Sequence, residues 1–428
     1  MEALRIEISI NARTGRFDTN WITAGSPPRT VPTSLHKDAL VGLRLELGRQ
    51  LQKAKDEIGS SLQPTWDQIN ASVVHLRKTG SFLMTQLFPQ NAFNVIETWR
   101  EQMAPFLLDP SAPPVVKIVG PDIGGMDHPA ANLLLPWEFL PLFSDNARHR
   151  RQINHPIDSN VVLANEMAQY VGHRCIVSRV LGEFGEQMPG PGGNPLAPVK
   201  KPDNWAKLFT CRTLQGPQIE EKRLRQLGRG RIRWDAWPRR QEKGTAAQMA
   251  AFMWRVTHCT RGRKRKTSDR IHHFASHFTV TSSEADQQFF TIAGCDKTAF
   301  KASLFELLAE IGNWNQQEPL PSKGGRPLVF VNACASSTIN PQGVASLPNL
   351  FFGQLRSRGF IGTETTMSDG VATEFAAEFY RRFIDGASLG RALYDARRAL
   401  VEKFRNPLGL YYTCYAHPEL SFSSLTSN

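Results

Sequence analysis

Cys334 and His277 are the two residues whose types and positions could support nucleophilic catalysis. Cys334 ends the apolar, β-branched run Pro327–Cys334, and His277 follows the run Arg270–Ala275. A thiol attacks as the thiolate, so at neutral pH it needs a nearby base or positive charge. If both runs are strands of one parallel sheet, their carboxyl ends lie at one edge, where catalytic groups collect. The sequence therefore permits a Cys–His pair that is distant along the chain and close in space.

Both residues also have an ordinary structural interpretation. A buried cysteine at a strand end is more often inert packing, and a histidine after a strand is more often a hydrogen-bonded loop residue. The six cysteines include no CxxC pair, which argues against a zinc site, and in a reducing cytosol all six are expected as free thiols. Position alone therefore leaves the catalytic interpretation open.

The elements that must position these residues alternate between strands and helices, which predicts a mainly parallel sheet with helices on both faces. We expect strands at residues 4–10, 113–120, 207–211, 232–237, 270–275, 327–334, 359–364 and 410–416, with half of a hairpin at 289–292. We expect helices at residues 37–58, 80–88, 218–227, 246–256, 299–311, 349–357, 372–384 and 389–404. The Pro- and Gly-rich stretch at 188–202 predicts a linker.

The net charge of +12 is concentrated in one region. Lys222–Lys266 holds fifteen Lys or Arg against two acidic residues. Its densest part is Arg261, Arg263, Lys264, Arg265 and Lys266. Two interpretations stand side by side: a nucleic-acid contact or cleavable loop, and a solvated loop and helix face.

The composition is that of an ordinary globular protein, with 41% hydrophobic and 21% charged residues. No apolar run approaches the roughly 20 residues that span a bilayer. The first residues lack the basic-then-apolar order of a signal peptide, so we expect a cytoplasmic protein without a membrane partner.

The wording of several segments resembles one family. IHHFASHF (271–278) is similar to the HFAGHG signature of the CHAT family, bacterial caspase-like peptidases related to caspases and separase, and LVFVNACASS (328–337) is similar to its LVFLNAC segment. The block 359–400, the ending YYTCYAHPEL and the upstream LLLPWEFL also follow the family pattern. The resemblance covers roughly residues 71–420 and implies a caspase-like three-layer sandwich.

The resemblance assigns roles to individual residues. It makes Cys334 the nucleophile and His277 the general base, and it implies no metal or organic cofactor. The backbone N–H groups of Cys334 and Phe278 would hold the oxyanion, a contribution of about 2.7–4 kcal/mol per donor. Ser276 and Phe278 stand where the family has glycines, and a bulky residue restricts φ there.

The pocket for the residue before the cleaved bond is expected around Asp369, with Glu364 and Asn332 nearby. A carboxylate there would favour Arg or Lys through charge-assisted hydrogen bonds. The alternative is that Asp369 caps the helix that starts near Val371. Both interpretations of Asp369 stay open on the sequence.

The resemblance divides the chain into an N-terminal segment (1–70), a pseudo-active half (71–187), the linker (188–202) and a catalytic half (203–428). It implies a cysteine endopeptidase that cleaves protein substrates, in bacterial antiviral defence or cell death. The basic stretch just ahead of the strand that leads to His277 suggests an enzyme kept inactive until a partner or an upstream protease acts. The basic loop at 261–266 is the expected cleavage point. The alternative is a catalytically weak caspase-fold scaffold that binds nucleic acid or a regulator through Lys222–Lys266.

Overall fold

A computed structural model describes residues 2–10, 14–23, 27–36, 39–88, 97, 111–120, 135–142, 156–181, 205–238, 244–254, 257–260, 263–266, 269–280, 288–293, 299–317, 327–332, 347, 350–355 and 357–422. The chain forms two compact units. The first comprises Met1–Glu186 and Leu393–Thr413, and the second comprises Gln187–Ala392 and Cys414–Asn428. The chain therefore leaves the first unit, builds most of the second, and returns.

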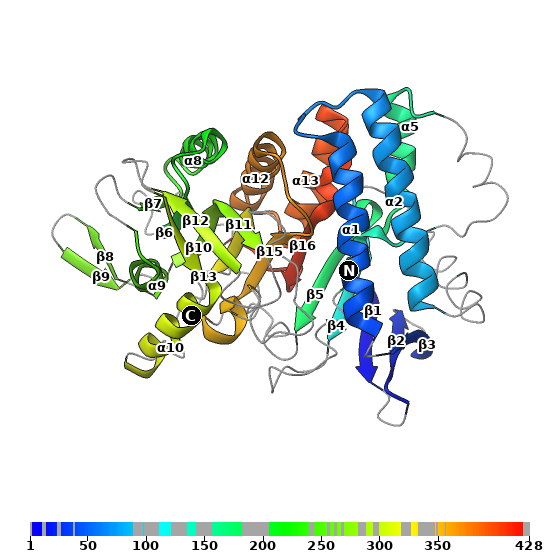
Figure 1. Cartoon of the computed structure of the whole chain (residues 1–428), viewed down its shortest axis with the longest axis horizontal. Coiled ribbons are helices and arrows are strands. Elements are labelled where there is room, and N and C mark those ends of the chain that lie inside the picture. Colours follow the sequence, from blue (N-terminus) through cyan, green and yellow to red (C-terminus); the bar gives the residue numbers. More distant parts are fainter. Residues whose placement is uncertain are drawn as a thin grey trace. The chain divides into compact units, whose positions relative to one another are not determined.

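The first unit combines an edge of antiparallel strands with parallel ones. Its strands are β1 (Glu2–Ile10), β2 (Arg16–Thr23), β3 (Arg29–His36), β4 (Val115–Gly120) and β5 (Ile176–Leu181), in the order β3-β2-β1-β4-β5. Pairs β1–β2 and β2–β3 are antiparallel, whereas β1–β4 and β4–β5 are parallel. Its helices are α1 (Leu40–Ile58), α2 (Trp66–Leu87), η5 (Trp137–Phe139), α5 (Asn160–Met167), α6 (Val171–Arg174) and η8 (Pro407–Tyr411). Helices α1 and α2 pack side by side (Figure 1).

The second unit contains the strands expected to carry the site. Its main sheet has the order β16-β15-β14-β10-β6-β7, formed by β6 (Trp205–Thr210), β7 (Arg233–Trp237), β10 (Asp269–Ala275), β14 (Leu328–Asn332), β15 (Gly359–Thr363) and β16 (Tyr412–Ala416). The pairs from β15 to β7 are parallel. All five residues of β14 and all five of β15 are buried, as expected for parallel strands covered on both faces.

Helices cover both faces of this sheet. The helices of the second unit are α8 (Gln215–Leu227), α9 (Ala246–Trp254), α10 (Leu304–Gln317), the π-helix η7 (Leu350–Gln354), α12 (Asp369–Ile384) and the start of α13 (Leu389–Phe404). On β10, His273 contacts α8 and α12, which pack together (Figure 1). The next residue, Phe274, faces the other way and stacks on Phe209, with ring centroids 4.2 Å apart, and Phe209 in turn meets Phe252 of α9. The expected α/β class, with a mainly parallel sheet between two helical layers, is confirmed.

Two small sheets complete the second unit. One has the order β11-β12-β13, from β11 (His277–Val280), β12 (Gln288–Ala293) and β13 (Ala299–Ser303). The other pairs β8 (Thr257–Thr260) with β9 (Arg263–Lys266) in antiparallel fashion. His277, expected just beyond a strand, therefore opens a new one.

Three predicted elements differ from the structure. The helix expected at 80–88 is only the end of α2, which starts at Trp66 behind a capping box between Thr65 and Gln68. The helix expected at 299–311 is wrong in its first five residues, because β13 pairs there with β12 and α10 starts only at Leu304. The loop expected at 261–266 is a strand from Arg263 onward, because only two residues separate it from β8.

Candidate active site

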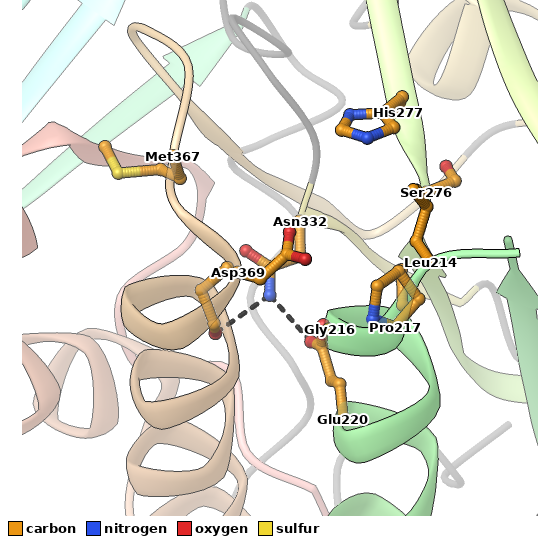
Figure 2. A pocket seen from close by; sticks show the side chains of 11 residues that line it. Leu214, Gly216, Pro217, Glu220, Ser276, His277, Asn332, Met367 and Asp369 are labelled. Carbon is orange, nitrogen blue, oxygen red and sulfur yellow. Dashed lines mark hydrogen bonds between the residues drawn. The ribbon is translucent and has the colours of Figure 1, made fainter. Parts of the chain in front are cut away.

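A pocket opens where the carboxyl ends of β10 and β14 lie side by side. These strands are parallel neighbours, and Ala275 is the register partner of Asn332. The pocket lies within the second unit. Its lining residues come from five elements and their ends: Leu214, Gly216, Pro217, Glu220, Ala275, Ser276, His277, Asn332, Met367, Asp369 and Ala372. Figure 2 shows His277 at the upper right, Asp369 of α12 toward the left and Glu220 of α8 below.

His277 reaches this pocket from the first position of β11. Its side chain is exposed to solvent, and its backbone pairs with Thr291 of β12. An exposed imidazole beside a pocket can accept and return a proton, which is what a general base must do. Cys334, the predicted nucleophile, lies outside the described residues, two positions after Asn332.

The backbone of Phe278 does not need the positive φ that favours glycine. The side chain is buried and packs on Phe290, with ring centroids 4.9 Å apart. Among the described residues, Arg405 is the only non-glycine residue with a positive φ, so Phe278 lies in the ordinary extended region. The substitution of a family glycine by Phe278 is therefore accommodated by packing the ring into the core of the small sheet.

Asp369 is both a helix-start residue and a pocket residue. It is the first residue of α12, the N-cap position belongs to Ser368, and the carboxylate lines the pocket. The expectation that Asp369 is the capping residue is therefore wrong, because Ser368 holds the N-cap position. The Asp369 carboxylate in the first turn still stabilises the helix through its interaction with the helix dipole. A β-carbon added at Gly216 would collide with the Asp369 carboxyl group, so the glycine makes room for it.

Beneath the pocket lies a chain of buried polar side chains that sequence reasoning missed. The Asn332 Nδ2 donates to Glu220 Oε1 at 2.6 Å and to the Ala372 carbonyl at 2.9 Å. The same Glu220 oxygen lies 2.8 Å from His273 Nε2, while His273 Nδ1 lies 3.0 Å from the Tyr380 hydroxyl. Burial raises the pKa of Tyr380 well above its usual value, so its hydroxyl keeps its proton and can donate to His273.

These contacts define a consistent set of donors. With the Tyr380 hydroxyl donating to Nδ1, His273 carries its proton on Nε2 and donates it to Glu220. Asn332, predicted as a substrate-binding residue, uses both amide hydrogens inside the protein. No periodicity could have identified Glu220, because its partners lie 53 and 112 positions away.

Glu364 does not share the pocket. It follows β15 and is buried, with 4% of its surface exposed, and it is absent from the described pocket lining. Its predicted role in substrate binding has no geometric support among the described residues.

The basic region is partly neutralised by acidic side chains. Three of its arginines form ion pairs: Arg223 with Glu374, Arg225 with Glu221, and Arg231 with Asp385. Arg263, Lys264, Arg265 and Lys266 form β9, and Arg261 lies outside the described residues. These pairs reduce the unbalanced positive charge that a nucleic-acid surface requires, along α8 and in the turn that follows it.

Three cysteines are buried and therefore poorly placed to act as nucleophiles. Cys175, Cys211 and Cys414 are buried free thiols. Burial raises the pKa of the Cys175 thiol to about 12, which leaves it protonated at neutral pH. Within the described ranges, no group of three His, Cys, Asp or Glu side chains could hold a metal ion. Likewise, none of the described helices has the length and apolar character of a membrane span.

Comparison with known proteins bears directly on this fold and pocket. The sequence model of the CHAT domain matches residues 148–418, which is more than half of the chain. A protein named "probable protease" from Vitiosangium sp. (strain GDMCC 1.1324) is 32% identical over 112 residues, which cover 26% of this chain and 14% of that protein. The match thus spans only a small part of that relative's length.

Two solved structures are similar at low sequence identity. One is the Arg-specific cysteine proteinase gingipain R, RgpB of Porphyromonas gingivalis, with a TM-score of 0.39, 11% identity, and coverage of 77% of this chain and 68% of that chain. The other is separase in the Saccharomyces cerevisiae separase–securin complex, with a TM-score of 0.47, 11% identity, and coverage of 97% and 30%.

An α/β sheet between helical layers, with a pocket at the carboxyl ends of its parallel strands, fits the caspase-like fold class. The extent of the domain match makes the assignment specific: the chain belongs to the CHAT-domain family.

Proposed function

We propose that the protein is a cysteine endopeptidase in which Cys334 is the nucleophile and His277 the general base. His277 takes the thiol proton, and the thiolate attacks the carbonyl carbon of the peptide bond. The bond to the amine then breaks, His277 returns the proton to the leaving amine, and a thioester remains on Cys334. Water, deprotonated by His277, hydrolyses the thioester and regenerates the thiol. The backbone N–H groups of Cys334 and Phe278 are the proposed oxyanion donors.

The register of β10 and β14 carries this proposal. Ala275 and Asn332 are partners in a parallel pair, and His277 and Cys334 each follow their partner by two residues. When two parallel strands end side by side, the residues that follow each strand start from the same edge of the sheet. His277 lines the pocket at that edge.

The chemistry of the first half supports the proposed division into a pseudo-active half (71–187) and a catalytic half (203–428). Cys175 is the only cysteine before residue 188. With a pKa of about 12, its thiol supplies essentially no thiolate at neutral pH.

The proposed substrate is a protein cleaved after a basic residue. Asp369 supports this preference, since its carboxylate lines the pocket and none of the described lining residues is Lys or Arg. A carboxylate in such a pocket binds a cationic side chain through charge-assisted hydrogen bonds.

The test uses a peptide electrophile with Arg at the position before the reactive group, followed by peptide mapping of the label. Cys334 should be the labelled cysteine, and labelling should be lost in C334A and strongly slowed in H277A. Cleavage of fluorogenic Arg peptides should be lost in the same two variants. Unchanged cleavage in both variants would refute the proposed dyad and favour the alternative of a caspase-fold scaffold.

We also propose that an upstream protease or a binding partner switches the enzyme on, within a bacterial defence or cell-death pathway. The support is the basic β8–β9 segment, which precedes the strand leading to His277. A trypsin-like protease would cut at its Arg and Lys residues. Mapping new termini after incubation with candidate activators tests this directly, and full activity of the intact chain would contradict it.

A further inference from the structure

Glu220 is a second carboxylate in the pocket, and the proposed chemistry does not use it. It lies on α8, one turn beyond Gly216, and only 3% of its surface is exposed. Asp369, the other pocket carboxylate, is exposed. The pocket therefore has one acid at its rim and one in its depth.

The two oxygens of Glu220 are used differently. Oε1 meets both donors beneath the pocket, the amide of Asn332 and the ring nitrogen of His273. Oε2 takes part in none of the hydrogen bonds found among the described residues, and it is not one of their fully buried, unpartnered atoms. The carboxylate is thus held firmly by one oxygen, while the other remains available to a ligand.

Glu220 and Asp369 come from different helices, α8 and α12, and both line this pocket. They give the pocket two carboxylates that can accept hydrogen bonds from a cationic ligand.

We propose that Glu220 is a specificity-determining residue that binds the guanidinium of an arginine before the cleaved bond, together with Asp369. The inference rests on the proposed peptidase function and narrows its substrate class from basic residues to arginine. A guanidinium presents five N–H donors in a planar fork and can serve two carboxylates at once. The lysine ammonium is a single point charge with three donors and a large hydration shell, so it matches separated acceptors less well.

The test of this inference replaces Glu220 Oε2, the oxygen that has no partner, and keeps Oε1. In E220Q the amide oxygen can still accept from Asn332 and His273, while an NH₂ group takes the place of Oε2. The buried hydrogen bonds survive and the pocket loses one negative charge. E221Q is the matched control, because Glu221 is the next residue of α8, pairs with Arg225 and does not line the pocket.

Cleavage is measured with peptides that carry Arg, Lys or citrulline before the scissile bond, because citrulline keeps the shape of Arg without its charge. E220Q should lower kcat/KM for the Arg peptide by about 10- to 100-fold, the range expected for a lost hydrogen bond to a charged group, and leave the citrulline peptide nearly unchanged. E221Q should match the wild type on all peptides. An Arg-to-citrulline ratio in E220Q equal to that of the wild type would overturn the inference.

A binding measurement separates this inference from the peptidase proposal. Fluorescence anisotropy of a labelled Arg peptide is recorded with C334A and with C334A carrying E220Q, so that no cleavage is needed. Weaker Arg binding in the double variant supports the role of Glu220 even if the wild type cleaves nothing. Equal binding of Arg and citrulline peptides to C334A refutes it even if Cys334 proves catalytic.

Discussion

Each of the two units contains a buried glutamate, and the two are satisfied in different ways. In the first unit, Glu138 is fully buried and uses both oxygens, Oε2 for Arg179 and Oε1 for Arg397. In the second unit, Glu220 receives Asn332 and His273 at the same oxygen. Both carboxylate oxygens of Glu138 are therefore paired within the protein, whereas Glu220 has one unpaired oxygen and lines a pocket.

The surroundings of the two clusters sharpen the contrast. The arginines around Glu138 also donate to main-chain carbonyls, at Leu135 for Arg179 and at Gly172 and Tyr412 for Arg397. Such an arrangement ties several segments of one unit together but offers nothing to a ligand. Both oxygens of the Glu138 carboxylate are paired within the protein, which fits a structural role, whereas Glu220 has one oxygen left for a ligand.

The largest expected effect comes from breaking the cluster around Glu138. Glu138→Ala leaves two buried guanidinium groups without their anion, and we expect the free energy of unfolding to fall by about 3–5 kcal/mol. Urea unfolding followed by circular dichroism measures this. Glu402→Ala is the control, since its i,i+4 pair with Arg398 is partly exposed and is expected to contribute about 0.3–0.5 kcal/mol. Equal unfolding curves for both variants would contradict the assignment.

Acid should weaken the first unit through His173. Burial, together with the nearby Arg398, Arg397 and Arg174, lowers the pKa of His173 to about 3, against 6.5 for an ordinary histidine. The unfolded chain binds this proton more readily, so stability is fully present above pH 6.5 and is lost as the pH falls toward 3. The loss should be about 2 kcal/mol between pH 6.5 and about pH 4.5.

His173→Gln tests this by removing the titrating group. Unfolding midpoints are measured across the same pH range, and the variant should have a flatter acid limb than the wild type. Parallel curves for the two proteins would show that His173 is not responsible for the acid sensitivity.

The open pocket should respond to an added methyl group. Gly216→Ala places a β-carbon against the Asp369 carboxyl group, and we expect kcat/KM for Arg peptides to fall about tenfold as the carboxylate is displaced. Stability should not fall in parallel, because Ala favours a helix by about 1 kcal/mol over Gly. Gly312→Ala in α10, where no atom lies within 4 Å of the new carbon, is the matched control and should cleave normally. Normal cleavage by the Gly216→Ala variant would contradict a role of Asp369 in substrate binding.

The smallest effect is expected at the far end of the second cluster. Tyr380→Phe removes the donor to His273 Nδ1 and should cost about 0.5–1.5 kcal/mol of unfolding free energy. Cleavage should change little, because Glu220 keeps both of its donors. Thermal unfolding and peptide kinetics on the same preparation test both statements. A loss of activity much larger than the loss of stability would mean that the whole chain of hydrogen bonds governs the pocket.

Much of the fold was predictable because parallel strands carry a strong signal. The runs around Val329 and Phe360 are almost continuously apolar, as is typical of strands buried on both faces. The missed boundaries had a readable signal as well. A Ser or Thr followed three residues later by Glu or Gln marks a helix start, and this pattern occurs at Ser303–Glu306 before α10 and at Thr65–Gln68 before α2.

The site was predictable only in part, for a physical reason. His277 and Asp369 are the first residues of β11 and α12 and come soon after the ends of the core strands β10 and β15, so their place at the sheet edge follows from strand order. Glu220 lies within an amphipathic helix, where an acidic residue ordinarily indicates the solvent face. Its burial depends on donors from two other elements, and no local pattern encodes that meeting.

The composition of the first unit has a consequence for synthesis on the ribosome. Glu138 and Arg179 lie before residue 187, whereas Arg397 belongs to the returning segment Leu393–Thr413. At about 5–20 residues per second, roughly 10 to 40 s pass between the emergence of the first unit and that of Arg397. During that interval the nascent unit holds a glutamate with half of its partners absent, so its completion is coupled to translation of nearly the whole chain.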